Sequence, residues 1–156
     1  MVHLEIHSGS VSRGKSSVNF ECFEELLLRT QYLFPERFPE KDTSLSLIFV
    51  NNKKIQELNK KYRKKNVATD VLSFLLYDAT SPEQIRPLGD LYISLQKAKI
   101  QAEHKKYSLQ GELNTLFTHG LLHLLGFDHK NTQDFFKMNA AEKQVLKSGK
   151  TLLGCA

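Results

Sequence analysis

The stretch His119-Gly-Leu-Leu-His123-Leu-Leu-Gly126-Phe-Asp128-His129 holds three of the six histidines of this chain. His119 and His123 are four residues apart, so on a helix their side chains lie one above the other on the same face. Gly126 follows three residues later, where a glycine can adopt the left-handed conformation that ends a helix. The chain can then turn back and bring His129 towards the other two rings. We therefore predict three neutral imidazoles with an open fourth position, which is typical of a catalytic zinc site.

The helix that carries the first two histidines is expected to begin after Ser108, a good N-cap residue. On a helical wheel its leucines and phenylalanine form one broad apolar face. Glu112, His119 and His123 lie together on the flank of that face. The two imidazoles can therefore border a cleft while most of the helix is buried.

The spacing of the histidines is that of the metzincin proteases, in which a glutamate follows the first histidine and acts as general base. In this chain Gly120 occupies that position. The metal ligands are therefore retained while the base for peptide hydrolysis is missing. A metzincin-like metalloprotease stays open only as the less favoured alternative.

Length and composition indicate one domain that spans residues 1–156. The hydrophobic fraction of 40% and the charged fraction of 25% are ordinary for a soluble globular protein. No apolar run approaches the roughly 18 residues that cross a membrane, and the first residues lack the features of a signal peptide. We therefore expect a cytoplasmic protein without membrane contact. The formal net charge of +5 favours a polyanionic partner.

Hydrophobic periodicity predicts strands that alternate with helices, which is typical of an α/β fold. The expected strands cover residues 2–7, 44–50, 69–77 and 89–94. The apolar end of the second strand suits an interior strand that is covered on both faces. Helices are expected after Asn19, after Asn51 or Asn52, from Ser94 to about Lys106, after Ser108, and over about 132–147. Segments 8–17 and 78–88 have the composition of loops.

The segment 53–65 is strongly basic, with Glu57 as its only acidic residue. Its lysines can form a solvated helix face, or they can bind the phosphates of a nucleic acid. Arg63 also suits the stabilisation of a phosphodiester under attack, because its guanidinium is planar, permanently charged and bidentate. The candidate nucleic-acid contacts are Lys60, Lys61, Arg63, Lys64 and Lys65.

Few residues are candidates for moving a proton at the metal site, where a bound water would have a lowered pKa. Asp128 adjoins a metal ligand and can instead orient an imidazole. Glu112 shares the histidine face but lies about two turns away. Asp70 can accept backbone hydrogen bonds at a turn. The sequence does not rank these three, and the metal-bound water can act without any of them.

Three motifs follow one another along the chain. The first runs from Leu58-Asn59 through Tyr62-Arg63 to Thr69-Asp70-Val71-Leu72-Ser73-Phe74, the second is Gly89-Asp90-Leu91-Tyr92-Ile93-Ser94, and the third is the histidine stretch. With this set, from about residue 45 to 130, the chain resembles the YbeY family of bacterial metal-dependent endoribonucleases.

The resemblance implies a mostly parallel four-stranded sheet surrounded by helices, with a metal site in a cleft. It implies His119, His123 and His129 as ligands of one zinc ion, although nickel or cobalt can also bind imidazole. It implies Arg63 as a functional basic residue near the metal. It further implies a single-strand-specific endoribonuclease that acts on the 3′ end of small-subunit ribosomal RNA and in ribosome quality control.

A non-catalytic function is the main alternative. A zinc ion can organise the helix end while the basic surface docks on ribosomal RNA or a small-subunit ribosomal protein, as in a ribosome-assembly factor. The open fourth position argues against this alternative, because structural zinc sites are usually closed. A cleavage assay with and without a chelator would separate the two functions.

Overall fold

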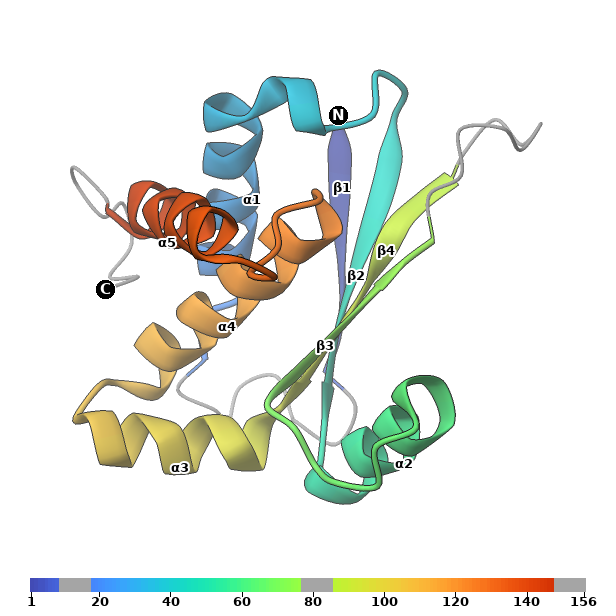
Figure 1. Cartoon of the computed structure of the whole chain (residues 1–156), viewed down its shortest axis with the longest axis vertical. Coiled ribbons are helices and arrows are strands. Elements are labelled where there is room, and N and C mark those ends of the chain that lie inside the picture. Colours follow the sequence, from blue (N-terminus) through green and yellow to red (C-terminus); the bar gives the residue numbers. More distant parts are fainter. Residues whose placement is uncertain (9–17, 77–85, 148–156) are drawn as a thin grey trace.

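A four-stranded sheet lies at the centre of the computed structural model, which describes residues 1–8, 18–76 and 86–147 (Figure 1). The strands are β1 (Val2–His7), β2 (Thr43–Val50), β3 (Val71–Leu75) and β4 (Arg86–Ser94), in the spatial order β1-β2-β4-β3. Most of the predicted loops 8–17 and 78–88 lies outside the described residues, as does the end of the predicted strand 69–77.

Three of the strands are parallel and one is antiparallel. β2 pairs in parallel with β1 and with β4, whereas the edge strand β3 runs antiparallel to β4. Only about ten residues separate β3 from β4, and a parallel crossover needs a dozen or more. The prediction of a single α/β domain with a mostly parallel four-stranded sheet is therefore confirmed.

Within the described parts of the chain, five α-helices and one short 3₁₀ helix accompany the sheet. They are α1 (Glu21–Leu33), η1 (Pro35–Arg37), α2 (Asn52–Arg63), α3 (Leu95–Lys105), α4 (Leu109–Leu124) and α5 (Thr132–Leu146). Figure 1 shows α1, α4 and α5 gathered beside one face of the sheet, with α2 apart from them. The helices therefore surround the sheet unevenly.

Most predicted helix starts are confirmed by their caps. The side chains of Asn51, Ser94 and Ser108 accept hydrogen bonds from the backbone N–H groups of Lys54, Lys97 and Gly111, at 2.8, 3.2 and 3.0 Å. The first helix begins one residue later than predicted. Its N-cap position is Phe20, while the Asn19 side chain accepts a hydrogen bond from the backbone N–H of Glu21 at 3.0 Å.

The core lies between the sheet and the helices α1 and α4. Along β2, buried residues alternate with half-buried ones, so the strand is interior to the sheet but fully covered on one face only. The sequence had suggested cover on both faces. The largest fully buried apolar side chains are those of Phe23, Phe117, Leu45, Leu47, Ile55, Leu91, Ile93, Leu113, Leu121 and Leu122. Among the described residues, no helix has the length and apolar character that crossing a bilayer requires.

Candidate metal centre

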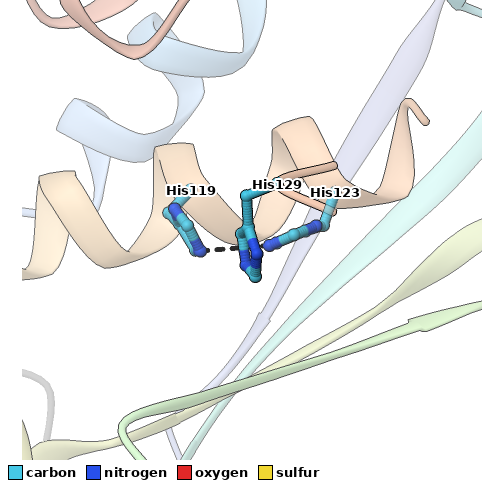
Figure 2. Close-up of side chains that lie close together, drawn as sticks. All are labelled: His119, His123 and His129. Atoms are coloured by element: carbon cyan, nitrogen blue, oxygen red, sulfur yellow. Dashed lines mark hydrogen bonds between the residues drawn. The ribbon is translucent and has the colours of Figure 1, made fainter. Parts of the chain in front are cut away.

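Three imidazoles meet beside the C-terminal half of α4. His119 and His123 project from successive turns of that helix, and His129 comes from the segment that follows it (Figure 2). One ring nitrogen from each residue lies within 4.8 Å of the other two. The structure thus brings together the three histidines that the sequence pattern selects, and the cluster can hold a metal ion.

The hydrogen bonds of the first two rings determine which nitrogen faces the centre. His119 Nδ1 is bonded to Glu142 Oε1 on α5, and His123 Nδ1 lies 3.1 Å from the carbonyl oxygen of Phe127. Both partners accept hydrogen bonds, so in each neutral ring the proton is on Nδ1. The two Nε2 atoms then carry lone pairs and face each other at 3.1 Å. Two converging lone pairs fit a shared cation, as in a carboxylate–histidine–metal arrangement.

The electrostatic surroundings of His123 also favour the neutral ring that a metal requires. Burial lowers the pKa of its imidazole below the usual value, and the neighbouring His119 and His129 add to this effect. Only neutral imidazole binds a metal ion. The site therefore favours the binding form of this ligand.

The turn after α4 is held from two sides. Gly126 has φ +89°, the left-handed conformation expected for a helix-ending glycine. Arg37 Nη1 donates to the carbonyl oxygen of Leu125 at 3.1 Å, and its guanidinium lies 3.8 Å from the centre of the Phe127 ring. The Phe127 ring also packs edge-on against Phe34. These contacts place Phe127, whose carbonyl orients His123, and direct the chain towards His129.

The histidines border a cleft of about 1180 Å³ between α4 and the strand β3. Arg63 and Lys65, from the end of α2 and the residues after it, line the same cleft. Arg63 Nη2 donates to the carbonyl oxygen of Ser73 at 2.7 Å, so the guanidinium is tied to the edge strand. Lys60, Lys61 and Lys64 are exposed but are not part of this lining.

The three proposed proton carriers all line the cleft, and each has another partner. Glu112 is fully buried and accepts hydrogen bonds from Lys105 Nζ at 3.0 and 3.2 Å. Asp70 accepts the backbone N–H of Val71 at 2.8 Å and the side-chain amide of Gln101 at 3.2 Å.

Asp128 interacts with the backbone of a histidine. Its carboxylate accepts the backbone N–H of His129 at 2.7 Å, and this bond holds the pKa of the Asp128 carboxyl below its usual range. Lys130 Nζ lies 3.5 Å from the same carboxylate. Asp128 therefore positions the segment that carries His129.

Gly120 is explained by packing between α4 and the sheet. A Cβ atom there would lie 3.0 Å from Leu91 Cδ2, 3.1 Å from Ser73 Oγ and 3.2 Å from Val71 Cγ2. The Ser73 hydroxyl also donates to the Gly120 carbonyl oxygen at 3.1 Å. The position that holds the protease glutamate is thus pressed against the sheet, and a longer side chain has no room.

Two positioning residues escaped sequence reasoning. Glu142 is 23 residues after its partner His119, and Arg37 is 88 residues before its partner Leu125. Neither stands in a local motif with the histidines. The only signal for Glu142 in the sequence is that it is an acidic residue of the predicted last helix. That signal does not identify the residue that its carboxylate contacts.

Comparisons with known proteins agree on one family. A family model described as Endoribonuclease YbeY matches residues 13–150. Endoribonuclease YbeY of Staphylococcus carnosus is 40% identical over 133 residues, which are 83% of this chain and 87% of that protein. Endoribonuclease YbeY of Caldicellulosiruptor bescii is 41% identical over 137 residues, or 82% and 85% of the two chains. The solution structure of TM1509 from Thermotoga maritima shares the fold, with a TM-score of 0.56 at 22% identity over 99% of each chain.

Proposed function

Because the chain belongs to the YbeY family of endoribonucleases, we propose that it is a metal-dependent endoribonuclease that cuts single-stranded RNA. The observation that supports this proposal best is the convergence of three imidazoles in a cleft that also contains Arg63 and Lys65. A nuclease needs a group that acts on water and a cation that acts on the phosphate. This cleft offers candidates for both.

His119, His123 and His129 would hold the metal ion, and zinc is the ion that three imidazoles favour most in hydrolytic sites. Nickel or cobalt would fit the same nitrogens. When bound, the ion would lower the pKa of water and polarise a phosphoryl oxygen. Glu142 and the Phe127 carbonyl would keep the rings of His119 and His123 in the orientation and tautomer that binding needs.

Arg63 would stabilise the negative charge that grows on the non-bridging oxygens of the attacked phosphodiester. Its bond to the Ser73 carbonyl positions the guanidinium at the cleft and engages one of its N–H groups. The remaining donors of the planar group suit two phosphate oxygens. Lys65 lines the same cleft and would attract the neighbouring phosphates.

Glu112, Asp70 and Asp128 act in this scheme as positioning groups rather than as general bases. The buried Glu112 carboxylate pairs with the exposed Lys105 ammonium, while Asp70 and Asp128 accept backbone N–H groups. For Asp128, the hydrogen bond from the backbone of His129 holds the pKa of the carboxyl below its usual range, so this carboxylate is a weaker proton acceptor.

The proposed substrate is ribosomal RNA, in particular the 3′ end of the small-subunit RNA, and the proposed protein partners are small-subunit ribosomal proteins. This follows the resemblance set out above and would place the protein in the cytoplasm. The competing function is a zinc-stabilised assembly factor that binds the same RNA without cutting it.

A cleavage assay on single-stranded and structured RNA tests the proposal. We expect the metal-loaded protein to cut the single-stranded RNA, and we expect a chelator or His129→Ala to abolish cutting. His104→Ala is a matched control, because His104 is an exposed histidine on α3 outside the cleft lining. If the metal-loaded protein binds RNA under all conditions and never cuts it, the assembly-factor function replaces the nuclease.

A further inference from the structure

A second pocket, of about 510 Å³, lies on the face of the sheet that points away from α4. Its aromatic wall has three rings in edge-on contact: Tyr62 and Phe74 at 5.2 Å between ring centres, and Phe74 and Tyr92 at 5.8 Å. Asp90 and Arg63 complete the polar part of the lining. We call this site the aromatic pocket.

The pleat of the sheet places the aromatic pocket opposite the metal centre. Successive side chains of a strand point to opposite faces. A Cβ at Gly89 would touch Leu124 of α4, and Leu91 lies against Gly120 of the same helix. Asp90 and Tyr92, which alternate with them along β4, therefore point to the other face, where Tyr62 of α2 covers Phe74.

We propose that the aromatic pocket binds an unpaired nucleobase of the RNA whose backbone crosses Arg63 on its way to or from the metal centre. The inference rests on the proposed action on single-stranded RNA and deepens it. It assigns a stacking platform to Tyr62 and Phe74, and it makes the edge strand β3 the ridge around which the RNA turns.

Continuity between the two sites is the first support. Arg63 and Leu75 line both the metal cleft and the aromatic pocket. Arg63 is tied to the edge strand by the Ser73 carbonyl, and its guanidinium carbon lies 5.5 Å from the centre of the Phe74 ring. A phosphate on Arg63 would thus have the histidines on one side and the aromatic wall on the other.

The chemistry of the lining identifies a base rather than a phosphate as the occupant. Asp90 contributes a carboxylate to the pocket, which would repel a phosphate. Carboxylate oxygens accept hydrogen bonds from base N–H groups, as aspartate and glutamate do from cytosine N4. Lys60 and Lys61, in the last turn of α2, are not part of the pocket lining, whereas Arg63 lines both the pocket and the metal cleft, where a backbone phosphate would pass.

The accessibility of the wall agrees with a stacking role. Tyr62 is 55% exposed although it is a large aromatic residue, and Leu75 and Leu76 at the rim are 60% and 49% exposed. Lys61 Nζ lies 5.1 Å from the centre of the Tyr62 ring. Proteins that bind single strands combine such aromatic platforms with a basic track, and stacking tolerates any base.

Photo-crosslinking tests the position of the base directly. The metal-loaded protein would be mixed with single-stranded RNA that carries 5-iodouridine at one position at a time, irradiated, digested and examined by mass spectrometry. We expect cross-links to Tyr62 or Phe74 from one or two adjacent positions only. Cross-links confined to residues outside the aromatic pocket at every position would overturn the inference.

Kinetics with matched variants give the second test. Tyr62→Leu keeps an apolar side chain and removes the ring, so KM for single-stranded RNA should rise roughly five- to a hundredfold, the range that one stacked base contributes. Tyr62→Phe keeps the ring and should restore KM to near that of the unaltered protein. Tyr32→Leu on α1 is the control, because Tyr32 is 84% exposed and belongs to the lining of neither the metal cleft nor the aromatic pocket.

The two proposals fail in different ways. If the protein cuts RNA and Tyr62→Leu has the KM of the control variant, the base site is wrong while the nuclease stands. If the protein cuts no RNA but cross-links a base to Tyr62, the nuclease is wrong and the aromatic pocket stands. Circular dichroism of Tyr62→Leu separates both results from a loss of folding.

Discussion

The imidazole of His119 depends on a single carboxylate from another helix. Glu142→Gln would keep the size of that side chain and remove its charge, so a neutral amide oxygen would replace the carboxylate that orients the ring. We expect metal affinity to fall by roughly ten- to a hundredfold. Metal titration followed by elemental analysis would measure the change.

The control for this substitution is Glu103→Gln, which neutralises an exposed acid on α3. It should leave metal affinity unchanged. A triple alanine variant of His119, His123 and His129 should hold no metal. Full metal occupancy in that variant would show that these histidines are not the ligands.

Substitutions of Arg63 separate the effect of its positive charge from the effect of its planar guanidinium geometry. Arg63→Lys retains the positive charge but loses the planar fork, so RNA cleavage should fall clearly while metal content is unchanged. Arg63→Ala should reduce kcat further, on the order of a hundredfold. RNA affinity should change much less than rate, since many contacts share the binding. Single-turnover rates and filter binding would give both numbers, and equal rates for Arg63→Ala and the unaltered protein would contradict the role.

The sequence predicted the site residues that lie close together in the chain, and it missed those that lie far from the histidines. The three histidines stand in one motif, because a helix and a glycine turn are local features that can bring the three rings close together. Glu142 and Arg37 act across long stretches of sequence. Their partners depend on how α5 and η1 pack, and hydrophobic periodicity does not specify that packing.

The close contact between α4 and the sheet limits which side chains fit at position 120. Gly120→Glu would place the glutamate of the metzincin proteases where Leu91, Ser73 and Val71 already stand. We expect a loss of stability on the order of 3 kcal/mol or more from overpacking and a buried charge, and no peptidase activity. Urea unfolding and a peptide assay would measure both effects.

Gly111→Glu is the control within the same helix. Position 111 is three residues after the cap Ser108, where glutamate can complete a capping box. This variant should unfold within about 1 kcal/mol of the unaltered protein. If Gly120→Glu proved equally stable, the packing explanation for the glycine would be wrong.

The face of β4 that points away from α4 carries a pH-dependent group, the carboxyl of Asp90. Burial raises the pKa of the Asp90 carboxyl, and its charge is therefore disfavoured in the folded chain relative to the unfolded one. The folded state gains stability as pH falls through this raised pKa and loses it as pH rises through it. Asp90→Asn should therefore stabilise the protein at neutral pH.

The gain from Asp90→Asn should disappear as the pH falls below about 4, where the carboxyl is protonated even in the unfolded chain. Thermal unfolding of both proteins across this range would show the two curves converge in acid. Curves that stay parallel at all pH values would contradict the raised pKa.

RNA binding is a property of the whole charged surface. Only Lys65 of the four proposed lysines lines the metal cleft, while Lys60, Lys61 and Lys64 are exposed along and just after α2. Replacing all four by alanine should flatten the plot of log affinity against log salt by roughly 0.7 for each lost single-strand contact. Fluorescence anisotropy at several salt concentrations would measure the slope.

Lys53 and Lys54 provide the matched comparison, because they are exposed at the other end of α2. Their double alanine variant removes two charges and should leave the slope nearly unchanged. An unchanged slope in the fourfold variant would mean that those lysines form an ordinary solvated surface and do not contact the RNA.

The fold could be predicted from the sequence where hydrophobic residues recur with the period of a strand or a helix. The alternation of strands and helices specified an α/β domain, and the predicted caps Ser94, Ser108 and Asn51 or Asn52 specified where three helices begin, with Asn51 as the observed cap of α2. The order of strands and the uneven placement of the helices were not predictable. They depend on which apolar helix faces pack against which part of the sheet. Several helices have apolar faces of similar composition, so the sequence does not single out one arrangement.

The three histidines that could hold a metal ion belong to α4 and the segment after it, while the carboxylate bonded to His119 belongs to α5. An ion held there would bind the native chain and not the unfolded one, so its binding free energy would add to the free energy of unfolding, about 2.7 kcal/mol at a hundredfold excess over Kd. Withdrawing the ion would loosen α5 first, speed the exchange of its amide hydrogens and expose it to proteolysis. The supply of metal in the cell would thereby set the lifetime of the protein as well as its catalytic rate.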